Sequence, residues 1–241
     1  MKVFLVLFCA FFIPVLSFGQ FSWGVKAGAS FSGYHSESAS GLNPEYKYQP
    51  GFQAGVFAEQ QLSERFSLQP ELLFSFRRAK ASVKETYSIP STTGYTTLEL
   101  EMTSRFSPLY LDLPVYFKMN VMEAKTGKLA LGLGPVFSYG LGGKVKVDGK
   151  LGSDETSGEQ KLFKEDEFVW TDDSGNQSTE MLMDDAPFKR FDFGWGGLAT
   201  YELPLGLAFN LSAQYGLLNI SNDEEEDLYS RSLVLGISYR F

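Results

Sequence analysis

The chain has 241 residues, of which 44% are hydrophobic, 15% aromatic and 21% charged, and its formal net charge is −8. This composition is too apolar for a disordered chain, and an acidic chain without a long basic run excludes a nucleic-acid partner. Its one Cys and one His exclude a disulfide framework, a cysteine-based zinc site and any site that needs two imidazoles, so no cofactor is expected.

The N-terminus carries the three regions of a secretory signal. Lys2 precedes an apolar run over residues 3–16, and Ser17 and Gly19 are small residues at positions −3 and −1 of a cut after Gly19. The run is about 14 residues long, short of the roughly 20 that span a bilayer, and Pro14 interrupts it. We therefore predict a signal peptide over residues 1–19 and a mature domain over residues 20–241.

Beyond the N-terminus, apolar residues alternate with polar or small ones at a period of two, which is the pattern of β-strands with one apolar face. Phe21, Trp23 and Val25, for example, alternate with Ser22 and Gly24. Most of these segments are close to the roughly 9–11 residues with which a tilted strand crosses a bilayer. The alternation predicts eight strands, which span residues 21–31, 52–58, 66–76, 109–119, 129–141, 191–201, 207–217 and 233–241.

The links between these strands alternate in length. Such alternation is typical of outer-membrane barrels, which have tight periplasmic turns and longer extracellular loops. Residues 97–102 and 144–147 keep the period of two inside long links, so several strands are expected to continue above the membrane. The short links are residues 60–65, 121–127 and 202–206, and the long ones are residues 33–50, 78–106, 143–188 and 218–231.

The face opposite the apolar one carries charged and amide side chains that cannot pack a dry core. A soluble eight-stranded barrel would instead fill its interior with apolar side chains or an apolar ligand. The apolar face therefore points outward into lipid, and closing the sheet pairs every backbone N–H and C=O, as hydrocarbon requires. The sequence predicts an all-β, eight-stranded antiparallel transmembrane β-barrel with short periplasmic turns, long extracellular loops and both termini in the periplasm.

Several segments, in this order and spacing, resemble a known family. They are Trp23-Gly24-Val25-Lys26-Ala27-Gly28, Leu109-Tyr110-Leu111-Asp112-Leu113-Pro114-Val115, Leu131-Gly132-Leu133-Gly134-Pro135, Arg190-Phe191-Asp192-Phe193-Gly194 and Tyr239-Arg240-Phe241. Together they resemble the small outer membrane protein β-barrel domain family of Gram-negative bacteria, described as porin-like, with PorT-like secretion proteins as relatives. The resemblance covers essentially the mature chain and implies a fold and an outer-membrane location, because most members have no established activity.

The closing residues of the chain imply a route into the membrane. A terminal aromatic residue preceded by alternating apolar residues resembles the signal that the outer-membrane assembly machinery reads. Tyr239 and Phe241 would form this signal. An ordinary last strand is the alternative.

An eight-stranded barrel has an interior just wide enough for its own side chains to fill it. Because unpaired charges buried there would be costly, we expect the inward charges to form a polar network of ion pairs that plugs the lumen. A paired-carboxylate catalyst made of Glu71 and Asp112 is the alternative. The expected members of the network are Lys26, Glu71, Arg77, Asp112, Lys118, Asp192 and Arg240.

Two further readings assign chemistry to the long links. The only histidine, His35, lies beside Ser36 and near Ser38 with Glu37 between them, but neighbours on one loop rarely form a positioned catalytic triad. The strongly acidic residues 143–187 and 223–227 could bind a divalent cation that also bridges lipopolysaccharide phosphates. A solvated surface is favoured, because no EF-hand spacing is present.

These observations favour a non-enzymatic outer-membrane protein with a structural or binding role exerted through its extracellular loops. Its expected partners are outer-membrane lipid and lipopolysaccharide, the outer-membrane assembly machinery, and a protein or extracellular ligand at the loops. The alternatives are a narrow transport pore, a component of a type IX-like secretion system and a lipid A-modifying enzyme.

Overall fold

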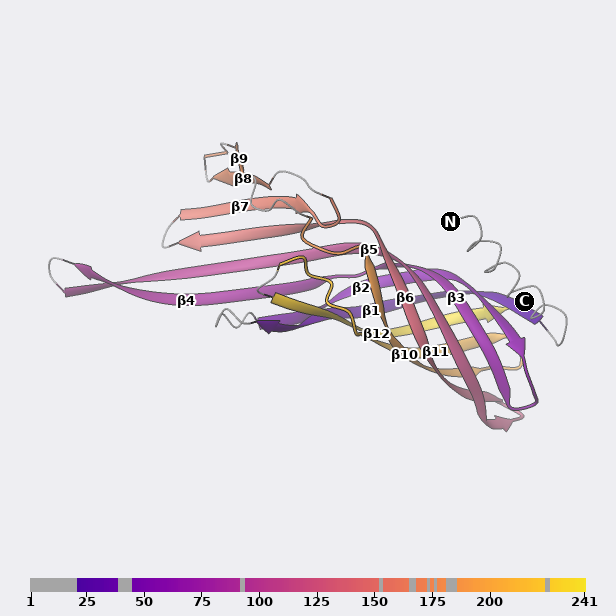
Figure 1. Ribbon diagram of the computed structural model, residues 1–241. Helices are drawn as coiled ribbons and strands as arrows, with labels where there is room; N and C mark the ends of the chain where they lie inside the picture. The colour runs from indigo at the N-terminus through magenta and orange to yellow at the C-terminus, as the bar shows by residue number, and fades with distance from the viewer. Residues whose placement is uncertain are drawn as a thin grey trace.

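The computed structural model describes most of the chain as antiparallel β-structure (Figure 1). Residues 1–20, which include the predicted signal peptide, lie outside the described residues. Within the described part of the chain, no helix is long and apolar enough to span a membrane. The described residues are 21–38, 45–91, 94–151, 154–164, 168–172, 174–175, 177–180, 186–223 and 226–241.

Eight strands close into a barrel, each paired antiparallel with the next, and the last pairs back onto the first. In order around the ring they are β1 (Phe21–Ser38), β2 (Glu45–Gln61), β3 (Phe66–Phe76), β5 (Gly94–Ala124), β6 (Gly127–Leu151), β10 (Phe191–Glu202), β11 (Leu207–Gly216) and β12 (Glu226–Arg240). This ring confirms the predicted eight-stranded antiparallel barrel.

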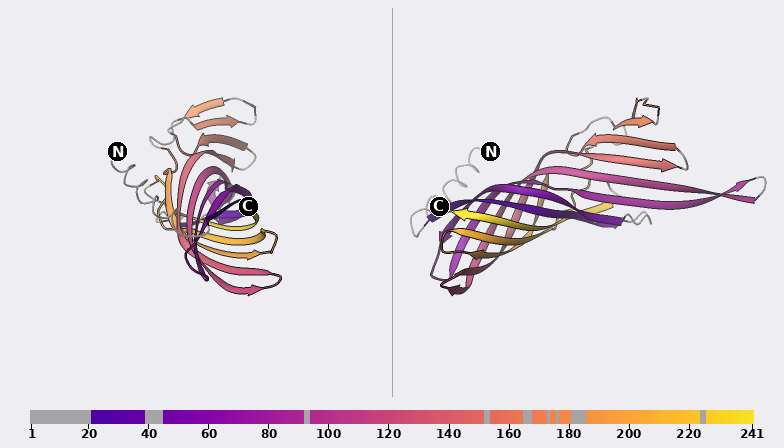
Figure 2. Two further views of the ribbon diagram at one scale, coloured as in Figure 1. Left: turned by 90° about the vertical axis from the view of Figure 1, so that its right-hand side faces the viewer. Right: turned by 180° about the vertical axis from the view of Figure 1, so that it is seen from behind.

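An extension of the same sheet projects from one side of the barrel rim (Figures 1 and 2). It forms where β5 and β6 run on past the barrel and pair with the added strands, so that most of the long links predicted over residues 78–106 and 143–188 are strands. We call this part the projecting sheet. Its added strands are β4 (Ala79–Ser91), β7 (Asp154–Lys161), β8 (Phe168–Asp172) and β9 (Gln177–Glu180).

The barrel has its apolar face outside and its polar face inside. Leu133 and Phe209 on the outer face are 62% and 53% exposed, whereas Asp112 and Glu71 on the inner face are 0% and 2% exposed. Aqueous folding would bury the first pair and expose the second. The inversion is stable only if a bilayer covers the outer face, and the closed ring satisfies the backbone there.

The end of the barrel away from the projecting sheet has tight turns. Residues 62–65, 125–126 and 203–206 connect the strands there, within the three predicted short links. Gly206 adopts φ +83°, a left-handed conformation that glycine reaches without a steric penalty. The C-terminus lies at the same end, where the Phe241 amide donates to the Trp23 carbonyl at 2.9 Å.

The main apolar core lies at the opposite mouth of the barrel, beneath the projecting sheet. It joins residues from the barrel wall to residues from the links before β10 and before β12. We call this group the mouth core. Its buried members are Tyr34, Ala79, Tyr110, Val145, Leu162, Phe163, Phe188, Ile220 and Leu228.

Candidate functional site: lumen, mouth core and projecting sheet

The lumen nearest the turns holds a buried cluster around Lys118. The ammonium Nζ of Lys118 lies 3.0 Å from Glu59 Oε1 and 2.6 Å from Gln69 Oε1. The Ser67 hydroxyl also donates to Glu59 at 2.6 Å. These side chains come from β2, β3 and β5, so the cluster connects three neighbouring strands of the ring.

The next level of the lumen is a buried pair between Lys26 and Glu71. Nζ of Lys26 lies 2.9 Å from Oε2 and 3.0 Å from Oε1 of Glu71. The Gln69 amide donates to Glu71 at 2.6 Å, so Gln69 contacts both Lys118 and Glu71. This amide links the two levels into one hydrogen-bonded network.

Arg77 is the main hydrogen-bond donor in the part of the lumen nearest the mouth core. Its Nη2 atom lies 2.8 and 2.9 Å from the two carboxylate oxygens of Asp112 and 3.2 Å from the Ser138 hydroxyl. Its guanidinium carbon stands 4.6 Å from the centre of the Tyr110 ring, within the range of a cation–π contact. Arg77 thus connects the polar lumen to an aromatic member of the mouth core.

Asp192 and Arg240 occupy the two ends of the lumen. Asp192 accepts a hydrogen bond from Ser230 at 2.5 Å and has no ion pair among the described residues. Arg240, near the turns, pairs with Glu202 and lies 3.6 Å from Glu59. The residues expected to line the lumen therefore form ion pairs at successive depths, some of them linked through Gln69 and Glu59. Asp192 is held by a hydroxyl instead of a cation.

The paired-carboxylate alternative does not match these contacts. Glu71 and Asp112 each face their own cation, Lys26 and Arg77 respectively. A general acid in such a pair needs a carboxyl whose proton is held by a neighbouring carboxylate or by an apolar pocket. Each carboxylate is instead engaged in a salt bridge of its own.

The candidate catalytic group around His35 has two described side chains, those of His35 and Ser36. Successive residues of a strand point to opposite faces, so His35 and Ser36 on β1 diverge. The Ser36 hydroxyl donates to Glu226 at 2.6 Å. The side chains of Glu37 and Ser38 lie outside the described part. Within that part, no group of three or more His, Cys, Asp or Glu side chains could hold a metal ion.

The mouth core closes the barrel above Arg77. The Tyr34 ring meets Phe106 and Phe188 edge-on, with ring centres 5.6 and 5.5 Å away, and Phe106 stacks on Phe188. Arg190 donates to the carbonyls of Phe163 and Gly140 at 2.6 and 2.9 Å, which ties the overlying link to the barrel wall. A packed apolar layer therefore lies between the polar lumen and the projecting sheet.

Sequence reasoning missed this layer. Leu162, Phe163, Phe188, Ile220 and Leu228 all lie in the predicted long links, where no strand periodicity marks them. The available signal was the presence of large apolar residues inside strongly polar links. Such residues indicate a satellite core beneath a folded link.

The chain end packs against the first strand. The Phe241 ring lies 4.4 Å from Trp23 and 5.2 Å from Tyr239, measured between ring centres. All three side chains are on the outer face and substantially exposed. They form an aromatic group at the turn end of the barrel, where a membrane–water interface is expected.

Two tyrosines outside the expected membrane span have perturbed phenols. Burial raises the pKa of Tyr34. Burial first, and then the hydrogen bond to Glu226, raises the pKa of Tyr46. Both phenols therefore stay neutral, and the Tyr46 hydroxyl donates to Glu226 at 2.6 Å.

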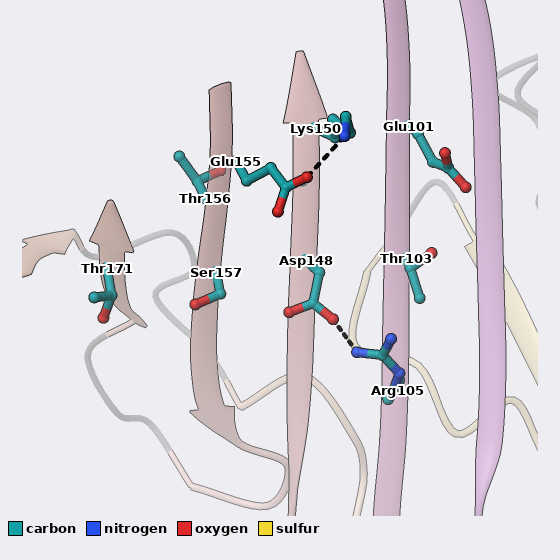
Figure 3. A pocket seen from close by; sticks show the side chains of 10 residues that line it. Glu101, Thr103, Arg105, Asp148, Lys150, Glu155, Thr156, Ser157 and Thr171 are labelled. Carbon is teal, nitrogen blue, oxygen red and sulfur yellow. Dashed lines mark hydrogen bonds and ion pairs between the residues drawn. The ribbon is translucent and has the colours of Figure 1, made fainter. Parts of the chain in front are cut away.

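The projecting sheet carries a polar groove of about 400 Å³ across β5 to β8 (Figure 3). Ion pairs join neighbouring strands within it, between Arg105 and Asp148 and between Lys150 and Glu155. The side chains of Ser157 and Thr171 lie on one side of these ion pairs and that of Thr103 lies on the other, as Figure 3 shows. We call this the ligand groove. Its lining is Glu101, Thr103, Arg105, Asp148, Gly149, Lys150, Glu155, Thr156, Ser157 and Thr171.

Comparison with known proteins identifies a family over most of the chain. The family described as outer membrane protein beta-barrel domain matches residues 17–222. A search of curated proteins gives no significant match.

Solved structures that resemble this chain are distant in sequence. Ail, the attachment invasion locus protein of Yersinia pestis, solved with the heparin analogue sucrose octasulfate, is 10% identical at a TM-score of 0.35, covering 92% of this chain and 99% of that one. OprG from Pseudomonas aeruginosa is 9% identical at a TM-score of 0.42, covering 91% and 95%. Neisserial surface protein A is 13% identical at 0.34, covering 92% and 99%.

The match over residues 17–222 agrees with the closed ring of eight strands and its outward apolar face. The chain therefore belongs to the outer membrane protein beta-barrel domain family and resides in the outer membrane of a Gram-negative bacterium.

Proposed function

We propose that this protein is a non-conducting, non-enzymatic barrel that binds a hydrophilic extracellular ligand on its projecting sheet. Two features of the barrel support the first part. Ion pairs fill the lumen from Glu59 to Arg77, and the mouth core covers them with packed aromatic rings. A solute would have to displace both, which a narrow eight-stranded barrel does not permit without unfolding.

The projecting sheet is built as a rigid binding surface. The hairpin of β4 and β5 pairs residue by residue from Ala79 to Ser91, and β6 and β7 pair from Lys144 to Leu151. Ion pairs such as Lys84–Glu101, at 3.0 Å, join strands across the surface. A preorganised surface loses less entropy on binding than a loose loop does.

The lining of the ligand groove indicates the chemistry of its ligand. It presents hydroxyls and charges of both signs and no large apolar side chain. Such a surface recognises a partner through hydrogen bonds rather than through apolar burial. Saccharides carry many hydroxyls, and each hydroxyl can both donate and accept a hydrogen bond. The groove therefore suits a saccharide ligand.

Planar-bilayer recording tests the non-conducting part of the proposal. The refolded protein should give no stepwise conductance, either as wild type or with Phe188→Ala in the mouth core. Reproducible conductance steps in the wild-type protein would support the transport alternative and contradict the sealed lumen.

A glycan array tests the binding part. The detergent-solubilised protein should bind a defined subset of saccharides, and a Lys150→Gln, Glu155→Gln, Ser157→Ala variant should lose that binding. A matched variant with Lys125→Gln, Glu123→Gln and Ser63→Ala, all at the turn end, should retain it. Binding that survives the first variant, or no binding at all, would contradict the proposed role of the groove.

A further inference from the structure

Four cations stand opposite one another across four neighbouring strands where the projecting sheet leaves the barrel. Lys47 on β2 is paired with Lys80 on β4, Lys80 with Arg105 on β5, and Arg105 with Lys146 on β6. Directly opposed residues of antiparallel strands lie on the same face of a sheet. We call Lys47, Lys80, Arg105 and Lys146 the basic row. Like charges in this arrangement repel one another, so the row is costly unless an anion lies against it.

A groove of about 440 Å³ is lined by three members of the row, Lys80, Arg105 and Lys146. Its lining adds two further cations, Arg78 and Lys144. Acidic residues neutralise only part of the charge. Glu45 lies 3.2 Å from Lys47, and Glu159 contacts Lys144 at 2.9 Å. Asp148 pairs with Arg105 and lies 4.0 Å from Lys146, so three carboxylates face six cations. Arg78 and Lys80 have no ion-pair partner among the residues that the structure describes. A chain with a net charge of −8 thus concentrates positive charge at one place on its surface.

This place lies directly above the lipid-facing surface of the barrel. The Arg78 guanidinium stands 5.2 Å from the ring centre of Phe76, whose ring packs against Phe52 of the outer face. Arg105 precedes the lipid-facing Leu109 by four residues, which is roughly 13 Å along a strand. The groove is therefore at the depth of the lipid headgroups, beside the ends of the acyl chains.

Charge is balanced farther from the membrane. Lys84 pairs with Glu101 at 3.0 Å, and Lys150 pairs with Glu155 at 2.7 Å, four residues farther along these strands than the basic row. The excess of cations is therefore restricted to the headgroup layer. A surface that attracts soluble polyanions could carry its cations at any height above the membrane. A surface that binds a membrane-bound anion must carry them at the height of the headgroups.

We propose that the basic row and Arg78 bind the phosphate groups of the outer-leaflet glycolipid, the lipid A part of lipopolysaccharide. Arg78 and Lys80 supply donors for one phosphate, and the acyl chains of the same molecule lie along Phe76 and its apolar neighbours. Charge-assisted hydrogen bonds from Arg and Lys are the strongest that a phosphate accepts. This site is nearer the membrane than the ligand groove and shares Arg105 with it. The proposal does not require the groove to bind a saccharide.

Native mass spectrometry of the full mature protein in a non-ionic detergent tests the site. The probes are bisphosphorylated lipid A, monophosphorylated lipid A and lipid A stripped of both phosphates. We expect adducts to weaken in that order. The variant Arg78→Gln, Lys80→Gln, Lys146→Gln keeps the Arg105–Asp148 pair and should bind bisphosphorylated lipid A about tenfold more weakly.

The matched control is Lys84→Gln, Lys125→Gln, Lys128→Gln, which removes the same charge at positions away from the basic row and should bind lipid A like the wild type. Equal loss in both variants, or no preference for phosphorylated lipid A, would overturn the proposal. Inorganic phosphate that displaces lipid A at equal concentration would also overturn it, because the site would then be one for free anions. If the glycan array detects no saccharide binding, the expected lipid A results stay the same, so the two proposals are tested separately.

Discussion

The ammonium of Lys26 lies 2.9 Å from Oε2 of Glu71 inside the barrel, with the two side chains 2% and 0% exposed. They come from β1 and β3, which are not neighbours in the ring, and β2 lies between them. The pair therefore reaches over the inner face of β2 and connects two strands that share no backbone hydrogen bonds. Because both side chains are buried, removal of either charge would leave the other one buried and unpaired, which strongly destabilises a fold.

Lys26→Met should destabilise the folded protein by about 3–5 kcal/mol, because it leaves the Glu71 carboxylate buried without its cation. The double variant Lys26→Met, Glu71→Gln should recover most of this loss, since no unpaired charge remains. Urea unfolding in liposomes measures both free energies. A double variant as unstable as the sum of the two single variants would show that the pair is not coupled.

Leu133→Arg should destabilise the barrel by about 2–4 kcal/mol, because it puts a charge on the lipid-facing surface near the bilayer midplane. Leu111→Arg and Leu131→Arg should act in the same direction, with a size that depends on their depth. The same unfolding assay measures the effect. Thr97→Arg, on the projecting sheet, is the matched control and should change stability by less than about 0.5 kcal/mol. An unchanged Leu133→Arg protein would contradict the outward assignment.

Phe188→Ala should loosen the mouth core. Its ring stacks against Phe106 and meets Tyr34, and truncating such a buried ring costs about 3–5 kcal/mol. Because the core lies outside the membrane span, the loss should appear as faster limited proteolysis in residues 186–190 while the barrel stays folded. Leu205→Ala, in an exposed turn, should leave the proteolysis pattern unchanged. An unaltered pattern in Phe188→Ala would mean that the core does not hold the link.

Tyr46 should resist ionisation at alkaline pH. Its pKa is raised above 10, so its neutral form stabilises the fold at pH below 10, and this contribution is lost only as pH rises through the folded-state pKa. Tyrosinate absorbance of the wild type minus that of Tyr46→Phe should show little ionisation at about pH 11. Tyr48→Phe controls for removal of an exposed phenol on the same strand. Full ionisation of Tyr46 near pH 10 would contradict its burial beside Glu226.

The period of two was sufficient to predict the membrane barrel. It identified all eight ring strands, because burial of one face in lipid imposes an alternation that a sequence displays directly. The predicted strands were too short where β1, β2, β5, β6 and β12 leave the membrane. Above the rim, neither face must be apolar, so residues such as Thr97 and Lys146 follow a weaker pattern.

The contacts of individual lumen residues were harder to predict from the sequence. Alternation predicts that Lys26 and Arg77 point inward, but it does not say which carboxylate each one meets. The partners depend on strand register and stagger, which place Glu71 against Lys26 and Asp112 against Arg77. The basic row was invisible for the same reason, because its members are far apart in sequence and only register brings them together.

Quenching of tryptophan fluorescence by lipids brominated along their acyl chains tests the central claim most directly, because the chain contains only three tryptophans. Trp195 lies on the outer face of the barrel, and Trp170 lies on β8 of the projecting sheet. In liposomes, a variant that retains only Trp195 should be strongly quenched, and one that retains only Trp170 should not. Equal quenching of the two, or a Trp195 signal that bromine leaves unchanged, would contradict a lipid-facing apolar surface.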